Sequence, residues 1–352
     1  MKRKTILFFS PNISTFIQRD IELLSSDYQV KIFNLNQGSP LKLIPQLFKQ
    51  LLFLIKNFRS ADISICFFAG YNSVLPVIFK RCFKLPTLII VGGTDAARFP
   101  KINYGSYVKR LNGMATAFSL RHCNHIIPVH ESLVYQKYTY DDAGAPEQGY
   151  TVFAKKTKNV PFTPVYFGFD SQFFKANENN RKPLTFITVG NLQHKSLYIR
   201  KGYDLIIELA RKRPELSFTL VGWDGKTHID VPKNVQLLPY MNQTEVKTAF
   251  TEHEFYFQLS VMEGMPNALC EAMLCGCIPI GSNVSGIPFV IGDTGYILEQ
   301  RNIDKLDNLI ENILSNDNRK ALSKAARERI KENFTYYRRQ KELSEIIELY
   351  TK

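Results

Sequence analysis

The sequence predicts an α/β protein with two doubly wound parallel-sheet domains in series. In both halves of the chain, short and nearly uninterrupted apolar segments alternate with amphipathic helical segments, as in parallel sheets covered by helices on both faces. The chain has 352 residues, which is long for one core and suits two domains of ordinary size. We expect the first domain over residues 1–170 and the second over 184–333, with a polar linker at 175–183.

The first half contains five segments that we interpret as strands, the first of them buried. They are rich in Ile, Phe, Val and Leu, which suits strands covered on both faces. The strands are expected at 4–10, 29–35, 62–69, 86–93 and 125–129. The helices between them are expected at 16–26, 41–58, 73–83 and about 104–121. From 136 to 160 the periodicity is lost, and turns are expected there.

The second half repeats the alternation. Its strands are expected at 184–191, 216–222, 234–239, 255–260 and 278–282, and its first helices at 202–213 and 244–253. A further helix follows the segment VMEGMP (261–266), and a last one is expected over 334–350. Ligands of doubly wound sheets bind where the carboxyl ends of the strands meet helix N-termini, so the loops after these strands are the candidate site.

Positive charge is concentrated in the first half. Residues 1–160 hold 21 Lys and Arg against 9 Asp and Glu, while the whole chain has a net charge of +13. This imbalance indicates a polyanionic partner or an anionic surface. Nucleic acid is not the predicted partner, because the sequence has no helix-turn-helix, RNP or Cys/His finger spacing.

The apolar runs and the cysteines indicate a cytoplasmic protein. No run reaches the ~20 apolar residues of a membrane span, and the start MKRKTILFFSPN reads as a first strand rather than a signal peptide. The six cysteines form no C-x-x-C pair and lie in apolar surroundings. We therefore expect reduced, buried thiols rather than disulfides or zinc ligands.

Two glutamates eight residues apart define the candidate site. Glu263 lies on a loop before the helix that Pro266 begins, and Glu271 lies about one and a half turns inside it. At ~1.5 Å per residue the carboxylates are about 10 Å apart, which is too far for a glycosidase pair but close to the span of a sugar-diphosphate-ribose. Gly264 lets a ligand approach the backbone, Asn267 shares the face of Glu271, and the first helical amides attract phosphate. The alternative is a capping glutamate and a surface glutamate, although a carboxylate in so apolar a helix needs donors to bind.

A basic turn supports a diphosphate ligand. Arg200 and Lys201 stand at the start of a helix, after a strand that ends in Gly190 and Asn191. A lysine in that position can reach a phosphate on the neighbouring loop. The alternative is a solvated basic turn in a basic protein.

Together these segments resemble the retaining glycosyltransferases of family four, of the bacterial surface-polysaccharide type. The matching residues are E-G-M-P-N-A-L-C-E-A-M with its E-x7-E spacing, then G-C-I-P-I-G-S and G-I-P, the V-G…R-K-G-x-D segment and the GGTD turn at 92–95. The resemblance covers most of the chain and is strongest over 184–300. It implies the GT-B fold, in which two Rossmann-like domains face each other across a cleft, and a last segment, 334–352, that crosses back onto the first domain.

The resemblance also implies roles for the matching residues. Glu271 would accept both ribose hydroxyls of a nucleotide-sugar, Glu263 would lie beside the transferred sugar, and Lys201 would neutralise the β-phosphate as it leaves. The diphosphate and the sugar hydroxyls would be held by Gly264, Met265, Pro266 and Asn267, and the base would lie near Leu238 and Tyr240.

The sequence departs from the family pattern at three places. Asn191 stands where the family usually has an arginine. Arg200 is the expected substitute, although on a regular helix Arg200 and its neighbour Lys201 would point in different directions. The glycine pair after the first strand is replaced by residues 10–14, SPNIS. The histidine after the fourth strand is absent, and Asp95 is the nearest polar candidate, with a helix N-cap as its alternative role.

No metal or other cofactor is expected. The sequence has no D-x-D, so the charge on the leaving group would be stabilised by Lys201, an arginine and a helix N-terminus. Uridine is the favoured base of the donor, and no residue excludes guanosine.

The helix expected at 41–58 carries lysines at sevenfold spacing, no acidic residue and a wide apolar face. Such a helix can lie in an anionic membrane interface, where each basic residue contributes ~1 kcal/mol. The alternative is a core-facing helix with a basic outer edge. Because acceptors in the resembled family are often lipid-linked saccharides, we expect peripheral contact with the inner face of the cell membrane.

The sequence therefore predicts a hexosyltransferase that moves a sugar from a nucleotide-diphosphate-sugar to a saccharide or lipid-linked saccharide, with retention of configuration. Two alternatives remain: a nucleotide-sugar-binding protein without transferase activity, and a nucleotide-sugar epimerase with the same fold. A dehydrogenase is disfavoured, because no strand is followed by G-x-G-x-x-G.

Overall fold

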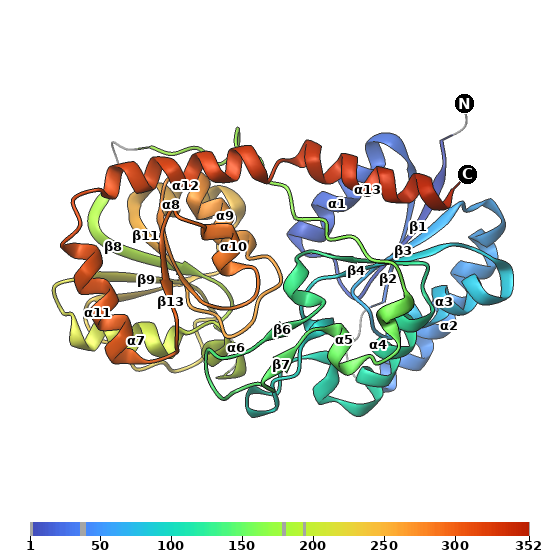
Figure 1. Cartoon of the computed structure of the whole chain (residues 1–352), viewed down its shortest axis with the longest axis horizontal. Coiled ribbons are helices and arrows are strands. Elements are labelled where there is room, and N and C mark those ends of the chain that lie inside the picture. The colour runs from blue at the N-terminus through green and yellow to red at the C-terminus, as the bar shows by residue number, and fades with distance from the viewer. Residues whose placement is uncertain (1–2, 36–39, 178–180, 193–194, 352) are drawn as a thin grey trace.

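The computed structural model describes residues 3–35, 40–177, 181–192 and 195–351, and it contains the two parallel sheets expected from the sequence (Figure 1). The strands of the first sheet lie between residues 5 and 128, and those of the second between 182 and 298. In the expected linker, residues 178–180 lie outside the described residues, and the second sheet already begins at Lys182. The exact domain boundaries stay a prediction.

The first sheet has the strand order β2-β1-β3-β4-β5, with every pair parallel. Its strands are β1 (Thr5–Ser10), β2 (Gln29–Asn34), β3 (Ile63–Phe67), β4 (Thr87–Val91) and β5 (His125–Pro128). Its helices are α1 (Thr15–Asp27), α2 (Pro40–Asn57), α3 (Tyr71–Phe83) and α4 (Arg110–His122). The side chains of β1, β3, β4 and β5 are buried throughout, which explains their continuous apolar sequences.

Short elements fill the loops of this half. The 3-10 turns are η1 (Phe58–Ser60), η2 (Thr94–Ala96), η3 (Pro100–Ile102), η4 (Ser106–Val108), η5 (Glu131–Leu133) and η6 (Thr157–Asn159). The turn-rich region expected at 136–160 contains a two-residue hairpin, β6 (Gln136–Lys137) with β7 (Glu147–Gln148), and the single turn α5 (Tyr150–Phe153).

The second sheet has the order β10-β9-β8-β11-β12-β13, again with every pair parallel. Its strands are β8 (Lys182–Val189), β9 (Ser217–Trp223), β10 (Val235–Pro239), β11 (His253–Gln258), β12 (Ile278–Ser282) and β13 (Tyr296–Leu298). Its helices are α6 (Lys195–Arg200), α7 (Tyr203–Lys212), α8 (Gln243–Glu252), α9 (Asn267–Leu274), α10 (Ile287–Ile291), α11 (Ile303–Leu314) and α12 (Arg319–Asn333). At its centre the ring of Phe186 stacks on Phe218, Phe255 and Phe257 at centroid distances of 5.3, 4.7 and 5.1 Å.

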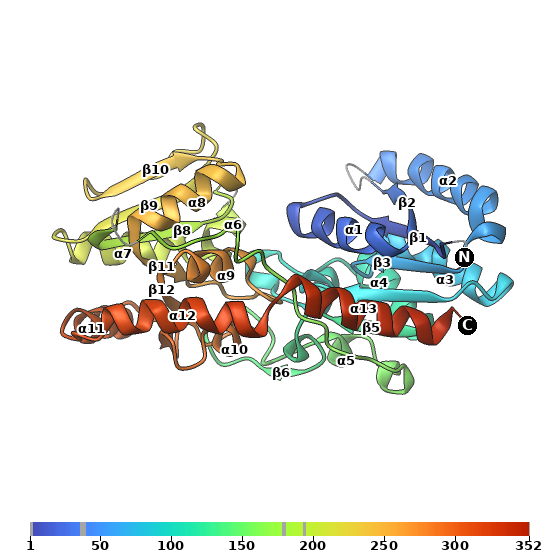
Figure 2. The same ribbon diagram turned by 90° about the horizontal axis from the view of Figure 1, so that it is seen from above.

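The final helix, α13 (Tyr336–Tyr350), packs against α1 of the first half (Figures 1 and 2). Its Arg339 forms two hydrogen bonds of 2.5 Å with the carboxylate of Asp20 on α1, and both side chains are only 1% exposed. The same guanidinium donates to the carbonyl oxygens of Val165 and Tyr166 and lies 4.5 Å from the ring centroid of Phe167. The chain therefore leaves the second half through α12 and is fixed back onto the first half by one buried charge pair.

Two expectations about this fold need correction. The helix expected from about residue 104 begins only at Arg110, because Gly105 has a φ of +104° and the turn η4 comes between them. Cys82 is exposed, whereas the other five thiols are buried as expected, since it lies on the outer side of α3.

We predict that Asp20→Asn lowers the free energy of unfolding by about 3–5 kcal/mol, because it leaves the buried guanidinium of Arg339 without a counter-charge. Denaturant unfolding followed by circular dichroism measures the change. Glu342→Gln is the matched control, since it removes the exposed partner of Arg338 on the same helix and should cost less than about 1 kcal/mol. Equal stability of Asp20→Asn and the wild type would contradict the anchoring role of the pair.

Candidate active site

A cavity of about 1110 Å³ lies between the carboxyl ends of the two sheets and is lined by residues of both halves. All of the site residues expected from the sequence line it except Asp95 and Leu238. Those that line it are Gly190, Asn191, Arg200, Lys201, Tyr240, Glu263, Gly264, Met265, Pro266, Asn267 and Glu271. The structure thus gathers three separate sequence segments at one place, and their roles stay predictions.

The loop between β11 and α9 forms one wall of the cavity. Pro266 caps α9, which begins at Asn267, so Glu263 stands on the loop and Glu271 lies inside the helix, as expected. At Gly264 an added Cβ would lie 2.4 Å from the carbonyl oxygen of Gly92 in the first half. A side chain at this position would therefore force the two backbones apart.

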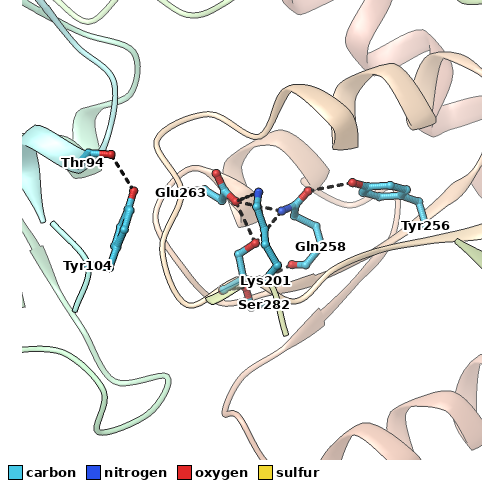
Figure 3. A network of polar contacts seen from close by, with 8 residues as sticks. Thr94, Tyr104, Lys201, Tyr256, Gln258, Glu263 and Ser282 are labelled. Carbon is cyan, nitrogen blue, oxygen red and sulfur yellow. Dashed lines mark hydrogen bonds and ion pairs between the residues drawn. The ribbon is translucent and has the colours of Figure 1, made fainter. Parts of the chain in front are cut away.

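Glu263 is the centre of a polar network (Figure 3). Its Oε1 accepts hydrogen bonds from Lys201 Nζ at 2.5 Å, from Ser260 Oγ at 2.9 Å and from Gln258 Nε2 at 3.3 Å. Gln258 Oε1 in turn accepts from the hydroxyl of Tyr256 at 3.2 Å. Three donors from the second half of the chain thus fix this carboxylate.

The ion pair of Glu263 and Lys201 is largely withdrawn from solvent, with side-chain exposures of 14% and 20%. Burial would raise the pKa of Glu263, but the nearby Lys201 and Arg200 outweigh burial and hold it below its ordinary value. Burial lowers the pKa of Lys201, an effect that Arg200 reinforces and Glu263 opposes. The two cations and one carboxylate together carry a surplus positive charge beside the cavity.

Arg200 and Lys201 both reach the cavity, although neighbours on a regular helix point in different directions. The reason is that α6 ends at Arg200, and Gly202 adopts a φ of +74° before α7 begins. The guanidinium of Arg200 lies 4.6 Å from the ring centroid of Tyr104, which belongs to the first half. Its Nε is buried and has no hydrogen-bond partner among the described residues.

Glu271 has a partner that the sequence did not suggest. Its Oε1 accepts a hydrogen bond of 2.8 Å from Arg19 Nη2 on α1, so an ion pair crosses from one half to the other. Burial raises the pKa of Glu271, and the charge of Arg19 opposes that rise. A carboxylate in so apolar a helix was expected to need donors, and Arg19 of the first half supplies one. The binding of ribose by Glu271 stays a prediction.

Asp95 occupies a different place from the other expected site residues. It is fully buried, and its carboxylate accepts hydrogen bonds from the backbone N–H groups of Ala69, Gly92 and Gly93 at 2.9–3.1 Å. Burial raises the pKa of Asp95 to about 6, an effect that these amides oppose. Asp95 lies inside η2 rather than at its N-cap, and it holds the loops after β3 and β4 together. Its catalytic role stays a prediction, and its contacts are those of a residue that positions two loops.

Leu238 lines a separate cavity with Thr219 and Met241, while the next two residues, Pro239 and Tyr240, line the cleft. The register of β10 against β9 shifts between Leu238 and Pro239. This irregularity turns the end of the strand and decides which side chains face the cleft.

Sequence reasoning missed several residues of the cleft. Thr15, Phe16, Phe68, Tyr104 and Phe167 come from the first half, while Trp223 ends β9 and Asp224 and Lys226 follow it. The rule that ligands bind at the carboxyl ends of parallel strands would have identified the residues after β9, because that strand was expected. Tyr104 and Phe167 follow no strand of the first sheet, and no signal in the sequence marks them.

Part of the chain matches a known family. Residues 169–329 match the family model described as "Glycosyl transferases group 1". The gpi3 subunit of the Schizosaccharomyces pombe phosphatidylinositol N-acetylglucosaminyltransferase is 25% identical over 150 residues, which cover 39% of this chain and 31% of that protein. The Escherichia coli UDP-Gal:alpha-D-GlcNAc-diphosphoundecaprenol alpha-1,3-galactosyltransferase is 26% identical over 172 residues, covering 45% of this chain and 44% of that protein. The alignments thus span less than half of the length of these relatives.

The similarity to solved structures extends over almost the whole chain. Sucrose-phosphate synthase from Thermosynechococcus elongatus has a TM-score of 0.77 at 14% identity and covers 99% of both chains. Anabaena HepE in complex with UDP and glucose has a TM-score of 0.70 at 13% identity, covering 99% of this chain and 100% of HepE. The expected architecture is therefore confirmed: the chain has the GT-B fold, and its residues 169–329 match the group 1 glycosyltransferases.

Proposed function

We propose that the protein is a retaining hexosyltransferase that moves a sugar from a nucleotide-diphosphate-sugar, with a UDP-sugar favoured, to a saccharide or lipid-linked saccharide. One observation carries the proposal: Arg200 and Lys201, both half-buried, line the same cleft as the N-terminus of α9, and Glu271 lies further along that helix. Two cations and a helix N-terminus can bind a diphosphate, and a carboxylate further along can bind the hydroxyls of the ribose that follows it.

Each group of the donor would meet a complementary group of the protein. The amides at the start of α9 and the surplus positive charge beside Lys201 would hold the diphosphate, and Glu271 would accept from the ribose hydroxyls. The buried Nε of Arg200 is a donor that a phosphate oxygen would satisfy. A diphosphate would also compete with Glu263 for Lys201, leaving Glu263 to turn toward the transferred sugar.

Stabilisation of the leaving diphosphate would come from protein cations and amides, without a bound metal. Among the described residues, no three His, Cys, Asp or Glu side chains cluster in a way that could hold a metal ion. Independence from metal stays part of the proposal. The preference for uridine is supported by solved neighbours that contain UDP, such as HepE with UDP-glucose and the pneumococcal O-GlcNAc transferase GtfA with UDP and GlcNAc.

The acceptor would enter from the first half. A second cavity of about 560 Å³ lies at the carboxyl ends of β1, β3 and β4, and Phe16, Phe68 and Thr94 line both this cavity and the main cleft. Phe68 adopts a φ of +65°, a strained conformation for a bulky residue, and such strain is found at ligand sites. An acceptor in the second cavity would lie beside the sugar of a donor in the main cleft.

Two alternatives use the same donor site. A nucleotide-sugar-binding protein without transferase activity is favoured by Asn191, which lines the cleft where an arginine was expected. An epimerase would act on the donor with no acceptor present. Assays of donor hydrolysis and transfer on the wild type and on Glu263→Gln, with and without acceptor, separate these alternatives from a transferase.

We predict that UDP or a UDP-sugar stabilises the protein, by ~2.7 kcal/mol at 100 times its dissociation constant. A thermal-shift panel of UDP, GDP and their sugars measures this effect and identifies the base. Glu271→Gln should lose most of the shift, while the control Glu252→Gln, which removes the partner of Lys182 away from the cleft, should keep it. If no nucleotide in the panel raises the melting temperature, the donor proposal is wrong.

We predict that Lys201→Ala lowers kcat by about 10²–10³-fold, because it removes one charged donor to the leaving phosphate, worth ~2.7–4 kcal/mol in the transition state. Initial rates of transfer measure the loss. Lys212→Ala, which removes an exposed ion pair with Asp304, is the control and should retain full activity. Full activity of a folded Lys201→Ala variant would exclude the assigned role.

We also propose that α2 touches an anionic membrane surface on the cytoplasmic side. Its outward face carries four exposed apolar side chains, Ile44 (75% exposed), Phe48 (60%), Leu52 (50%) and Ile55 (54%). Lys49, Lys56 and Arg59 are exposed beside them, while the side chain of Lys42 lies outside the described residues. No helix in the described ranges has the length and apolar character needed to cross a membrane. A helix with such a face can lie in the interface instead.

We predict that the protein sediments with anionic vesicles at low salt and is released as the salt concentration rises, since basic residues contribute ~1 kcal/mol each. Phe48→Ser combined with Leu52→Ser should abolish sedimentation. Tyr337→Ser, which removes an even more exposed side chain from α13, is the control. A wild-type protein that stays in the supernatant refutes membrane contact.

A further inference from the structure

Arg19 on α1 forms an ion pair that reaches from the first half of the chain into the donor site. Its Nη2 lies 2.8 Å from Oε1 of Glu271 on α9, and both side chains are only 13% exposed. Arg19 follows Thr15 and Phe16 by one helical turn, and these two residues line the cleft. The guanidinium therefore stands beside the cleft, behind the carboxylate that is expected to receive the ribose.

The position of Arg19 is fixed from two sides. Its guanidinium lies 6.0 Å from the ring centroid of Phe174, a buried residue in the segment between the two sheets. The next residue, Asp20, is locked to Arg339 of α13. Because consecutive helical residues project about 100° apart, α1 holds α9 through one residue and α13 through the next.

The partner helix α9 is fixed as well. It packs against α12, and Arg327 of α12 donates to the carbonyl oxygens of Phe174 and Leu274. The ion pair thus joins α1, which is bound to α13, with α9, which packs against α12. Such a pair orients its members at little cost in side-chain entropy.

We propose that Arg19 is a positioning residue of the donor site: its ion pair with Glu271 sets that carboxylate to accept the ribose hydroxyls, so donor affinity depends on the first half of the chain. This inference rests on the proposed function. It concerns a residue with no expected role and a contact that only the assembled fold creates.

Electrostatics supports this role. Burial raises the pKa of Glu271 and Arg19 opposes the rise. Without Arg19 the effect of burial is unopposed, so the pKa of Glu271 rises further and the carboxyl group is protonated at a higher pH. A protonated Glu271 accepts the ribose hydroxyls less well, so the loss of donor affinity on acidification should begin at a higher pH than in the wild type.

The other titratable groups around Glu271 are Cys270 on α9, Cys275 after it, Tyr256 on β11 and Tyr336 on α13. Burial raises the pKa of each of these thiols and phenols above its ordinary value, so they stay neutral in the range where Glu271 would titrate. The acidic groups Asp170 and Glu22 act on Tyr336, and the guanidinium of Arg327 acts on Cys275. Glu271→Gln tests whether a pH effect belongs to Glu271 rather than to these neighbours.

The test is isothermal titration calorimetry of the full chain with UDP and GDP, using the nucleotide that the wild type binds. Arg19→Gln should raise its Kd about tenfold near neutral pH, equal to about 1.4 kcal/mol. Arg19→Lys should recover part of the affinity, because a charge is restored without the planar fork. Arg213→Gln, which removes an ion pair with Asp307 of similar exposure away from the cleft, should leave Kd unchanged.

Two further measurements distinguish positioning from a general loss of positive charge. Arg19→Gln should change Kd much less for the 2′,3′-dideoxy nucleotide and for inorganic pyrophosphate, because neither presents the ribose hydroxyls. The pH at which affinity begins to fall should be higher in Arg19→Gln than in the wild type, and this difference should vanish in the Glu271→Gln background. If Arg19→Gln does not fold, Arg19→Lys with the same ligands and pH series carries the test.

The outcomes separate the two proposals. A wild type that binds UDP or GDP, together with an Arg19→Gln variant of unchanged or tighter affinity, overturns the inference alone. If Arg19→Gln does not fold, unchanged or tighter affinity of Arg19→Lys overturns it instead. Equal losses for the nucleotide and for pyrophosphate also overturn it, since Arg19 would then act on phosphate charge. A wild type that binds no nucleotide overturns the proposed function and this inference with it.

Discussion

The arrangement of the cleft depends on one close backbone approach between the two halves. A Cβ at Gly264 would lie 2.4 Å from the carbonyl oxygen of Gly92, and a Cβ at Gly286 would lie 2.4 Å from the carbonyl oxygen of Gly264. Three segments, which follow β4, precede α9 and precede α10, therefore lie directly on one another at these glycines. Gly92 and Gly264 both line the cleft, so this contact forms part of its wall.

Hydrogen bonds on both sides hold this approach in place. In the first half, Asp95 binds the amides of Gly92 and Gly93 and ties their turn to the loop after β3. In the second half, Glu263 is bound by Lys201, Ser260 and Gln258 immediately before Gly264. The fully buried carboxylate of Asp95 and the half-buried carboxylate of Glu263 thus fix the two backbone turns that meet.

Much of the fold could be predicted because strands and helices leave local patterns of apolar residues in the sequence. Parallel strands buried on both faces have continuous apolar sequences, so β1, β3, β4, β5 and β12 could be identified from their apolar runs. The short strand β13 and the helix α6 were missed, since three and six residues are too few to show a period. The start of α4 was placed too early because the conformation of Gly105 is set by the turn before it.

The sequence by itself determined which chemical groups the site contains: the glutamates eight apart, the basic turn and the glycines that admit a close approach. Spacing along one loop and one helix is enough to place these groups relative to one another, because local geometry is regular over such distances. Only the tertiary structure decided which group neutralises which. Three contacts join residues far apart in the chain. Glu271 pairs with Arg19, Asp95 accepts a hydrogen bond from the amide of Ala69, and the guanidinium of Arg200 lies over the ring of Tyr104. Such contacts arise when two sheets and a crossing helix pack, and no local pattern carries them.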